Sequence, residues 1–389
     1  MIRPRDGAPM MATTYHSFST LPPGYTRLFD DWGTVGYNFT PAWFENFVET
    51  ALDPDQQVRI YGIAAADRAS TPVAALPMRH RARAGWMPTP RRLWGLSNYY
   101  TSLFGPVVDR GRVDRAHLID ELARAVCAER PRWDVLDLNP LDRDSPMFEE
   151  FRDALTRHGM LVQPYFAFGN WYLEVAGRSY ADYLGGLPSV LRKNIPYYTR
   201  KLQKTFDTRI DLVTTNDGFT EALAAYDKVY RASWKHQEPY PEFVPGLSQT
   251  AIKHGWLRLG VAYLDGEPAA AQLWFVHAGI AAIFKVSYDE RFTKHSVGTV
   301  LTAKIMEHVI DIDKVHTVDF LSGDDSYKKH WMSHRRERWG LYAMNTRTMT
   351  GCVSILRHVG GRAMQSAWAA WKRPGTEGAT VATGTERQP

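Results

Sequence analysis

The segment 283–331 constrains the fold more than any other part of this chain. It reads as a strand, a short polar loop, a long helix, a second strand and a further helix that begins with a Tyr-Lys-Lys cluster. Ser296 and Gly298 place small residues at the start of the long helix. There, unpaired backbone N–H groups and the positive end of the helix dipole can receive a phosphate. The segment therefore predicts a group-transfer enzyme that holds a nucleotide-tailed cofactor.

Size and composition indicate a globular protein of about two domains. The chain has 389 residues, of which 44% are hydrophobic and 23% charged, as is usual for such proteins. The net charge of +5 mildly favours anionic partners without choosing among them. Two cysteines, Cys127 and Cys352, provide neither a disulfide framework nor a cysteine-based metal site. Residues 1–27 contain no apolar core of a signal peptide, so we expect a cytoplasmic protein.

Helical and strand patterns alternate along the first half and predict a layered α/β domain. The expected helices are 41–52, 114–129 and 146–158, and the expected strands 58–66, 71–81, 93–108, 133–141 and 166–175.

The second half begins with a basic helical stretch that we expect to break at Gly185–Gly186 and near Pro196. Asp265–Gly266 and Ala278–Gly279 have the composition of hairpin turns. The expected elements are helices at 217–236, at 296–311 and from about residue 325, and strands at 256–264, 267–277, 280–288, 316–322 and 338–345.

This order of elements resembles the N-acetyltransferases of the GNAT superfamily. The stretches YADYLGGLPSVLRKNIPYYTRKLQK, FKVSYDERFTKHSVGTVL and VDFLSGDDSYKKHW are closer still to its CelD-like branch. That branch is associated with the biosynthesis of cellulose and other polysaccharides and is related to the FemAB-type transferases. The resemblance covers about residues 28–345. It implies an α/β fold of two GNAT-like units in tandem, with mixed, mostly antiparallel sheets flanked by helices.

The resemblance also implies a division of the chain. We expect an N-terminal extension at 1–27, a degenerate GNAT-like domain at 28–176 and a GNAT acetyltransferase domain at 177–350. A basic amphipathic helix at 351–373 would either dock on the second unit or make peripheral contact with a membrane. The tail 374–389 has few residues that could pack and should be disordered.

In GNAT enzymes a (Gln/Arg)-x-x-Gly-x-(Gly/Ala) loop wraps the pyrophosphate of acyl-CoA. The resemblance places this loop at residues 291–299, and Thr299 or Val300 stands near the place of the family's second glycine. The splayed strands of the family imply that backbone groups of the preceding strand bond the pantetheine arm. The cofactor expected is acetyl-CoA or another acyl-CoA, without a metal, and the alternative for Ser296 is a plain helix cap. The residues expected at the cofactor are Val286, Ser287, Arg291, Lys294, Ser296, Gly298 and Thr299.

Amide formation needs a base for the attacking amine and an acid for the departing thiolate. The resemblance implies Tyr327 as the acid, and nearby Lys328 and Lys329 would favour its ionised form or hold a phosphate. The alternative is a tyrosine that packs at a helix start. Asp319 lies in an apolar strand, where a carboxylate is either catalytic or paired with a nearby cation. The pair Asp289–Glu290 and a chain of waters are the other candidates for the base.

The segment 191–204 is basic and contains no acidic residue. Arg192 and Lys193 in this segment, together with Lys328, are candidates for binding a phosphate-rich substrate, and the alternative is a solvated helix face. The sequence shows no motif with the spacing of metal ligands.

We therefore expect acyl transfer from acyl-CoA to a small-molecule amine by direct attack. The resemblance suggests an amino sugar or another cell-envelope or polysaccharide precursor as the acceptor, and enzymes of polysaccharide synthesis as partners. One alternative is a FemAB-type transferase that uses aminoacyl-tRNA, which would be the only nucleic acid partner expected. The other is a non-catalytic accessory subunit of a polysaccharide synthase.

Overall fold

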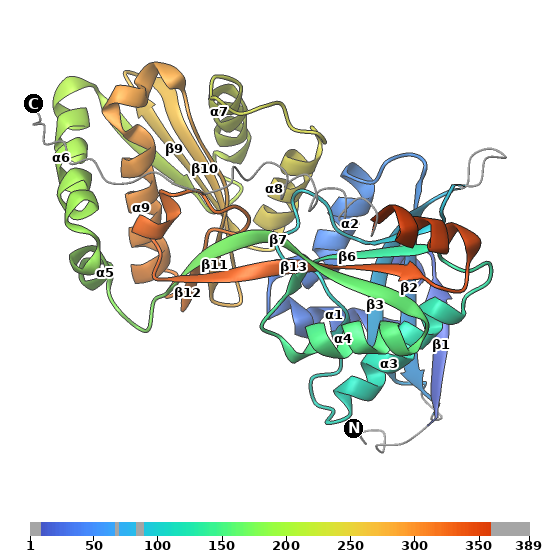
Figure 1. The fold of residues 1–389 in the computed structure, drawn as a ribbon. Helices are drawn as coiled ribbons and strands as arrows, with labels where there is room; N and C mark the ends of the chain where they lie inside the picture. The colour runs from blue at the N-terminus through green and yellow to red at the C-terminus, as the bar shows by residue number, and fades with distance from the viewer. Residues whose placement is uncertain (1–8, 67–69, 83–88, 359–389) are drawn as a thin grey trace, which may run out of the picture.

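The computed structural model describes residues 9–66, 70–82 and 89–358 of the chain. These residues form one mixed, mostly antiparallel sheet of 13 strands, flanked by helices on both faces (Figure 1). The expected tail at 374–389, and the part of the expected C-terminal helix beyond residue 358, lie outside the described residues. Residues 349–358 of that helix are helical.

The first half of the chain forms one end of the sheet. Its helices pack on strands β2, β3 and β7. Residues 10–15, expected in an N-terminal extension, form the edge strand β1, which pairs with β2. The elements are β1 (Met10–Tyr15), α1 (Pro23–Gly33), α2 (Pro41–Thr50), β2 (Gln56–Ala65), β3 (Pro72–Arg81), β4 (Arg92–Gly95), β5 (Val107–Val108), α3 (Arg115–Ala128), β6 (Val135–Asp142), α4 (Pro146–Arg157) and β7 (Met160–Glu174).

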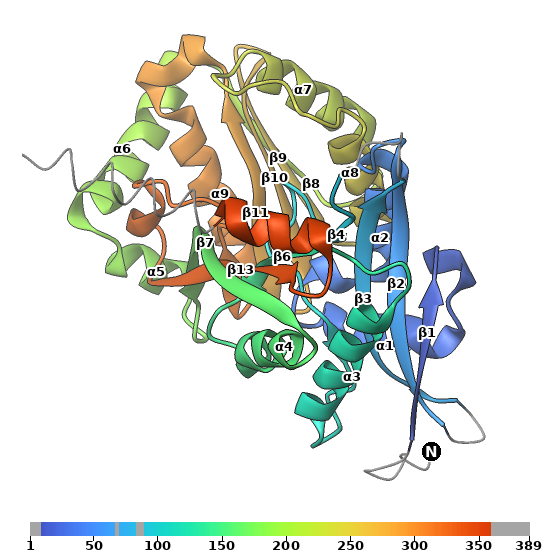
Figure 2. The ribbon, with the colours of Figure 1, turned by 45° about the vertical axis from the view of Figure 1, so that its right-hand side comes forward.

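The second half forms the other end, with α5, α6 and α9 on one face of the sheet and α7 on the opposite face (Figure 2). The elements are α5 (Tyr180–Gly186), α6 (Ser189–Thr205), β8 (Thr208–Val213), α7 (Phe219–Arg231), α8 (Phe243–Lys253), β9 (Leu257–Leu264), β10 (Glu267–His277), β11 (Ile280–Tyr288), a 3-10 helix at Glu290–His295, α9 (Val297–Asp311), β12 (Thr317–Asp319), a 3-10 turn at Lys328–His330 and β13 (His334–Asn345).

The long strands β7 and β13 belong to both halves. β13 lies between β6 and β7, and β7 also pairs with β12, so that the sheet is continuous. Read from its outer edge, the first half has the order β1-β2-β3-β4-β6-β13-β7, and the second half has the matching order β8-β9-β10-β11-β12-β7-β13. Each half contains one parallel pair, β4 with β6 and β11 with β12. The two halves are therefore repeats of one unit, and each lends a strand to the other.

Local sequence explains several expected elements. Thr40 caps α2 by accepting a hydrogen bond from the Trp43 amide, with Pro41 as the first helical residue. Both hairpin turns are confirmed, since Asp265–Gly266 and Ala278–Gly279 have positive φ at both positions.

Two expectations for the second half were wrong. Helix α6 continues through Pro196, because Ile195 and Leu202 are buried with residues of α9 in one apolar cluster, and this packing offsets the lost hydrogen bond. The helix expected from about residue 325 is only the short 3-10 turn. The loop before it is fixed instead by Asp324, which accepts a hydrogen bond from Trp171 Nε1 and pairs with Arg335, both at 2.7 Å.

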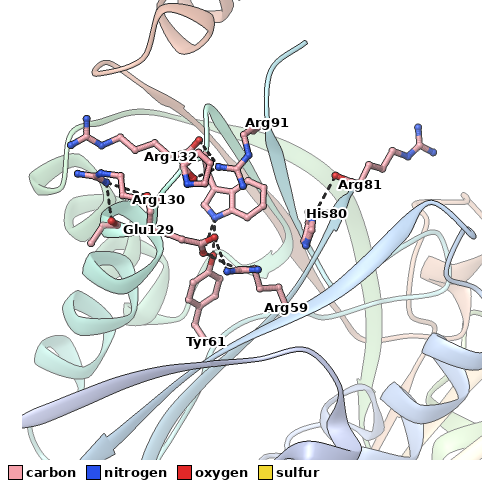
Figure 3. Close-up of polar contacts among 11 residues, drawn as sticks. Arg59, Tyr61, His80, Arg81, Arg91, Glu129, Arg130 and Arg132 are labelled. Carbon is pink, nitrogen blue, oxygen red and sulfur yellow. Dashed lines mark hydrogen bonds and ion pairs between the residues drawn. The ribbon is translucent and has the colours of Figure 1, made fainter. Parts of the chain in front are cut away.

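A partly buried polar cluster fixes the end of α3 to the sheet of the first half (Figure 3). The Glu129 carboxylate pairs with Arg59 at 2.7 Å and accepts a hydrogen bond from the Tyr61 hydroxyl. The Arg91 guanidinium stacks over the Trp133 ring at 4.2 Å from its centroid. The charges of Arg59 and Glu129 thus satisfy each other within the protein.

The shared strands lead to a stability prediction at Gly340. This glycine of β13 lies opposite Tyr165 of β7, and a Cβ at residue 340 would overlap the Tyr165 ring. The ring cannot move freely, because its hydroxyl donates to Asp137 Oδ1 at 2.6 Å. We expect Gly340→Ala to lower the free energy of unfolding by about 2–3 kcal/mol, in a single urea transition.

Gly185→Ala is the matched control, because a Cβ at this helical position meets no atom within 4 Å. It should leave stability unchanged or raise it. An unaltered urea midpoint for Gly340→Ala would contradict the packing of β13 against β7.

Candidate active site

The parallel strands β11 and β12 separate after three residues. Residues 280–282 of β11 pair with residues 317–319 of β12, where β12 ends, but β11 continues to Tyr288. Beyond residue 282, therefore, no strand of the described residues neighbours this edge of β11. Its backbone groups can bond a ligand instead. β11 and β12 therefore splay apart, which the sequence alone could not establish.

A cavity of about 600 Å³ lies beside the separated strands. It is bounded by β11, the beginning of α6, the loop before α9 and the segment 320–331. Its size is that of a cofactor or ligand site. The lining residues are Pro188, Val190, Leu191, Asn194, Trp234, Val286, Ser287, Tyr288, Phe292, Thr293, Ser296, Val297, Gly298, Thr299, Thr302, Phe320, Tyr327, His330 and Trp331.

The beginning of α9 points backbone donors at this cavity. Ser296 has a left-handed conformation, with φ of 53°, and its side chain caps no amide. The amides of Thr299 and Val300 donate to the Ser296 carbonyl oxygen. Val297 and Gly298 are the first two residues of α9, so no carbonyl group of the helix lies where their amides could bond it. They are therefore placed to receive an anion, together with the positive end of the helix dipole.

The expected cofactor residues divide into two groups. Neither Arg291 nor Lys294 lines the cavity. Arg291 instead pairs with Asp289 at 2.7 Å and is largely exposed. The structure brings the other five together around one cavity, namely Val286, Ser287, Ser296, Gly298 and Thr299.

A second, more polar pocket of about 310 Å³ adjoins the cavity, and Trp234, Val286, Phe320 and Tyr327 line both. Tyr99 and Tyr100, which follow β4 in the first half, form one wall of this polar pocket. The Tyr100 ring stacks on Phe243 of α8, with centroids 4.1 Å apart. Both halves of the chain therefore contribute to the site.

A β-bulge at Phe284 changes which side chains of β11 face the polar pocket. Leu273 pairs with Lys285 and Trp274 with Ile283, which leaves Phe284 as the extra residue. Phe284 and Lys285 both line the polar pocket. Local twist at the bulge thus directs a lysine into a largely buried position.

Glu238 balances the charge of Lys285. Lys285 is 7% exposed, and its Nζ lies 2.7 Å from Glu238 Oε1. The Tyr100 hydroxyl donates to Glu238 Oε2 at 2.7 Å. Burial by itself raises the pKa of Glu238, but the charge and hydrogen bond of Lys285, together with hydrogen bonds from Tyr230 and Tyr100, lower it more, so the carboxylate stays ionised.

Tyr327 lies where the two pockets meet. Partial burial, and after it the charge of Asp325, raises its pKa to about 12. The expectation that lysines would favour the ionised phenol was therefore wrong. Lys328 bonds elsewhere, since its Nζ lies 2.7 Å from the carbonyl oxygen of Ser322 and 3.3 Å from Asp325. A neutral phenol is the form that can donate a proton.

The sequence left open whether Asp319 is catalytic or paired, and the structure gives it partners. Its Oδ1 accepts hydrogen bonds from Asn170 Nδ2 at 2.6 Å and from the Leu321 amide at 2.7 Å, and Oδ2 pairs with Arg336. Asp319 lines neither pocket. Asp289, one member of the Asp289–Glu290 pair also considered, is paired with Arg291.

Of the candidate substrate-binding residues, only Lys328 lies at the site, in the wall of the polar pocket. Arg192 and Lys193 are exposed on α6 outside the lining. The Arg192 guanidinium donates to the Gly185 carbonyl oxygen at 2.7 Å.

Sequence reasoning missed most of the polar pocket. The sequence did contain a signal for Lys285. A charged side chain within an apolar strand is either catalytic or paired, which is the argument that singled out Asp319, and Lys285 lies within the apolar strand 280–288. No local pattern marks the residues that approach from other elements, namely Tyr99, Tyr100, Trp234, Lys235 and Glu238.

The described residues contain no group of three or more His, Cys, Asp or Glu side chains that could hold a metal ion. Among the same residues, none of the helices is long and apolar enough to cross a membrane.

Residues 189–329 match the family model described as "Acetyltransferase (GNAT) domain". This range includes α6, the separated strands, α9 and Tyr327. This segment therefore resembles a GNAT-type acetyltransferase domain in sequence. No curated protein matches the chain in sequence.

Among solved structures, the chain is similar to FemX, with 10% identity and a TM-score of 0.59, over 88% of this chain and 99% of FemX. That likeness concerns the fold and extends over both halves. A tandem GNAT protein of the clavulanic acid biosynthesis pathway is similar with 12% identity and a TM-score of 0.49, over 86% of this chain and 98% of that chain. The expected α/β fold of GNAT-like units is confirmed, whereas nothing found singles out the CelD-like branch.

Proposed function

We propose that this protein transfers an acyl group from acyl-CoA, acetyl-CoA in the first instance, to an amine. The observation that carries the proposal is the cavity of about 600 Å³ between the separated strands, which begins at the amino end of α9 and ends at Tyr327. The amides of Val297 and Gly298 suit the pyrophosphate. The open edge of β11 at Val286 and Ser287 suits the amide groups of pantetheine.

In this arrangement the thioester lies near Tyr327, and the amine enters through the polar pocket. The amine nitrogen attacks the thioester carbon, and the tetrahedral intermediate then expels the CoA thiolate. The neutral Tyr327 phenol protonates that thiolate. A water chain takes the proton of the amine. We propose a cytoplasmic reaction and, from the resemblance to the CelD-like branch, an amino sugar or another cell-envelope or polysaccharide precursor as acceptor.

The second candidate is a FemAB-type transferase that takes its acyl group from aminoacyl-tRNA. The similarity to FemX across both halves favours it, as does the exposed basic face of α6. Against it stands the mostly apolar lining of the cavity, which suits a pantetheine arm better than the end of a tRNA.

A charge placed at the start of α9 tests the cofactor site. Thr299 lines the cavity in the first turn of α9, where an acidic residue stabilises a helix. Thr299→Glu should therefore fold well but repel the CoA pyrophosphate. We expect its affinity for CoA in calorimetric titration to fall by roughly tenfold or more.

The neutral Thr299→Gln, of nearly equal size, is the control and should bind CoA better than Thr299→Glu. Unchanged CoA binding by Thr299→Glu would contradict the assigned site. Thermal stabilisation of the wild type by charged tRNA but not by CoA would favour the second candidate.

The acid role of Tyr327 predicts a loss of rate without a loss of binding. Tyr327→Phe should lower kcat by roughly 10²–10⁴-fold and leave CoA affinity unchanged, because the hydroxyl acts on the leaving thiolate. With a pKa of about 12, the phenol stays protonated around neutral pH, and its ionisation should cause no loss of kcat there. Thiol release measured from pH 6 to about pH 10 checks both statements.

Tyr197→Phe is the control, since this tyrosine is exposed on α6 and lines neither pocket. A wild-type kcat for Tyr327→Phe would remove Tyr327 from the mechanism.

A further inference from the structure

The polar pocket collects three lysine side chains, Lys235, Lys285 and Lys328. Two of them have partners within the protein. Lys285 is paired with Glu238 at 2.7 Å. Lys328, only 5% exposed, bonds carbonyl oxygens of the loop 322–323 and lies 3.3 Å from Asp325. Both ammonium groups are thus largely committed to holding the pocket together.

Lys235 differs from the other two. It follows α7 and lines both the polar pocket and a neighbouring hollow. Within the described part of the chain, its Nζ has no hydrogen bond and no ion pair. The rings of Tyr230 and Trp234 lie beside it, each with its centroid 5.8 Å from Nζ. These rings position the ammonium group but leave its N–H donors free for a ligand.

The charges around Lys235 leave an excess of positive charge. Two cations face it, Lys285 and Lys328, and two carboxylates, Glu238 and Asp325. In the neighbouring hollow, Arg231 and Asp227 pair with each other at 2.9 Å. With Lys235 protonated, three ammonium groups therefore face two carboxylates. Burial, and after it the charge of Lys285, lowers the pKa of Lys235 to about 8.

We propose that the polar pocket binds an anionic group of the acceptor, a carboxylate or a phosphate monoester, and that Lys235 is the residue that binds it. A single negative charge beside Lys235 would balance the pocket and occupy the free N–H donors. The same charges disfavour polyamines. This inference rests on the proposed N-acyl transfer and narrows the acceptor class to amines that carry an anionic group.

The pH dependence separates this role from that of a general base. Anion binding needs the protonated ammonium, and its protonated fraction falls as pH rises through about 8. We therefore expect KM for an anionic acceptor to rise above that pH. A general base would be active when deprotonated, so kcat would rise over the same range in the wild type but not in Lys235→Met, which would contradict the proposal.

Two matched pairs of acceptors test the inference, with acetyl-CoA as donor and thiol release as readout. They are glucosamine 6-phosphate with glucosamine, and β-alanine with β-alaninamide. In the wild type the anionic member of one pair should have the lower KM, and which pair responds distinguishes phosphate from carboxylate. Lys235→Met should raise that KM by tenfold or more and leave the neutral member within twofold. Lys235→Arg should retain most of the preference.

Lys253→Met, at an exposed lysine of α8, is the control and should behave as wild type. Equal effects of Lys235→Met on both members of each pair, or no preference in the wild type, would overturn the inference but leave N-acyl transfer intact.

Absence of thiol release with every amine would instead refute the proposed function. A thermal-shift measurement would then test the anion site. Stabilisation of the wild type but not of Lys235→Met by glucosamine 6-phosphate or β-alanine would support it, and equal shifts would overturn it.

Discussion

The exchange of β7 and β13 between the two halves is the constraint on which the rest of the structure depends. Each half needs a strand supplied by the other to complete its seven-stranded order, because a sheet edge that stays unpaired leaves backbone groups without partners. In the assembled sheet the segment after β4 lies against α8, where Tyr100 stacks on Phe243. The first half therefore supplies a wall of the polar pocket, and the site exists only in the assembled chain.

Two local departures from regular strand pairing in this sheet form the site. The early end of β12 at Asp319 leaves one edge of β11 open, and the bulge at Phe284 directs Lys285 into the polar pocket. The repeat in the first half also has a parallel pair, β4 with β6. There, however, the chain after β4 is packed closely, and Leu96 and Phe104 are buried. Among the described residues, the cavity of about 600 Å³ beside the separated strands lies in the second half.

The apolar periodicity and the turn residues predicted most elements and the order of the second half. The beginning of α9 was predicted from the small residues Ser296 and Gly298, because the start of a helix depends on local backbone geometry. The exchange of strands could not be predicted, since β13 pairs with β6 across a long sequence separation that no local pattern records. For the same reason Lys235 and Glu238 were missed: their proximity to Lys285 follows from tertiary packing. Asp319 was correctly singled out as a costly carboxylate, but its partners, Asn170 and Arg336, lie on other strands.

The central claim is that acyl-CoA lies between the separated strands, with its pyrophosphate at the beginning of α9 and its sulfur near Tyr327. A crystal structure of the protein with bound CoA tests it most directly. The account predicts phosphate oxygens within hydrogen-bond distance of the Val297 and Gly298 amides, the pantetheine arm along Val286 and Ser287, and the sulfur atom beside the Tyr327 hydroxyl. CoA bound elsewhere on the chain, or a cavity that stays empty at saturating CoA, would contradict it.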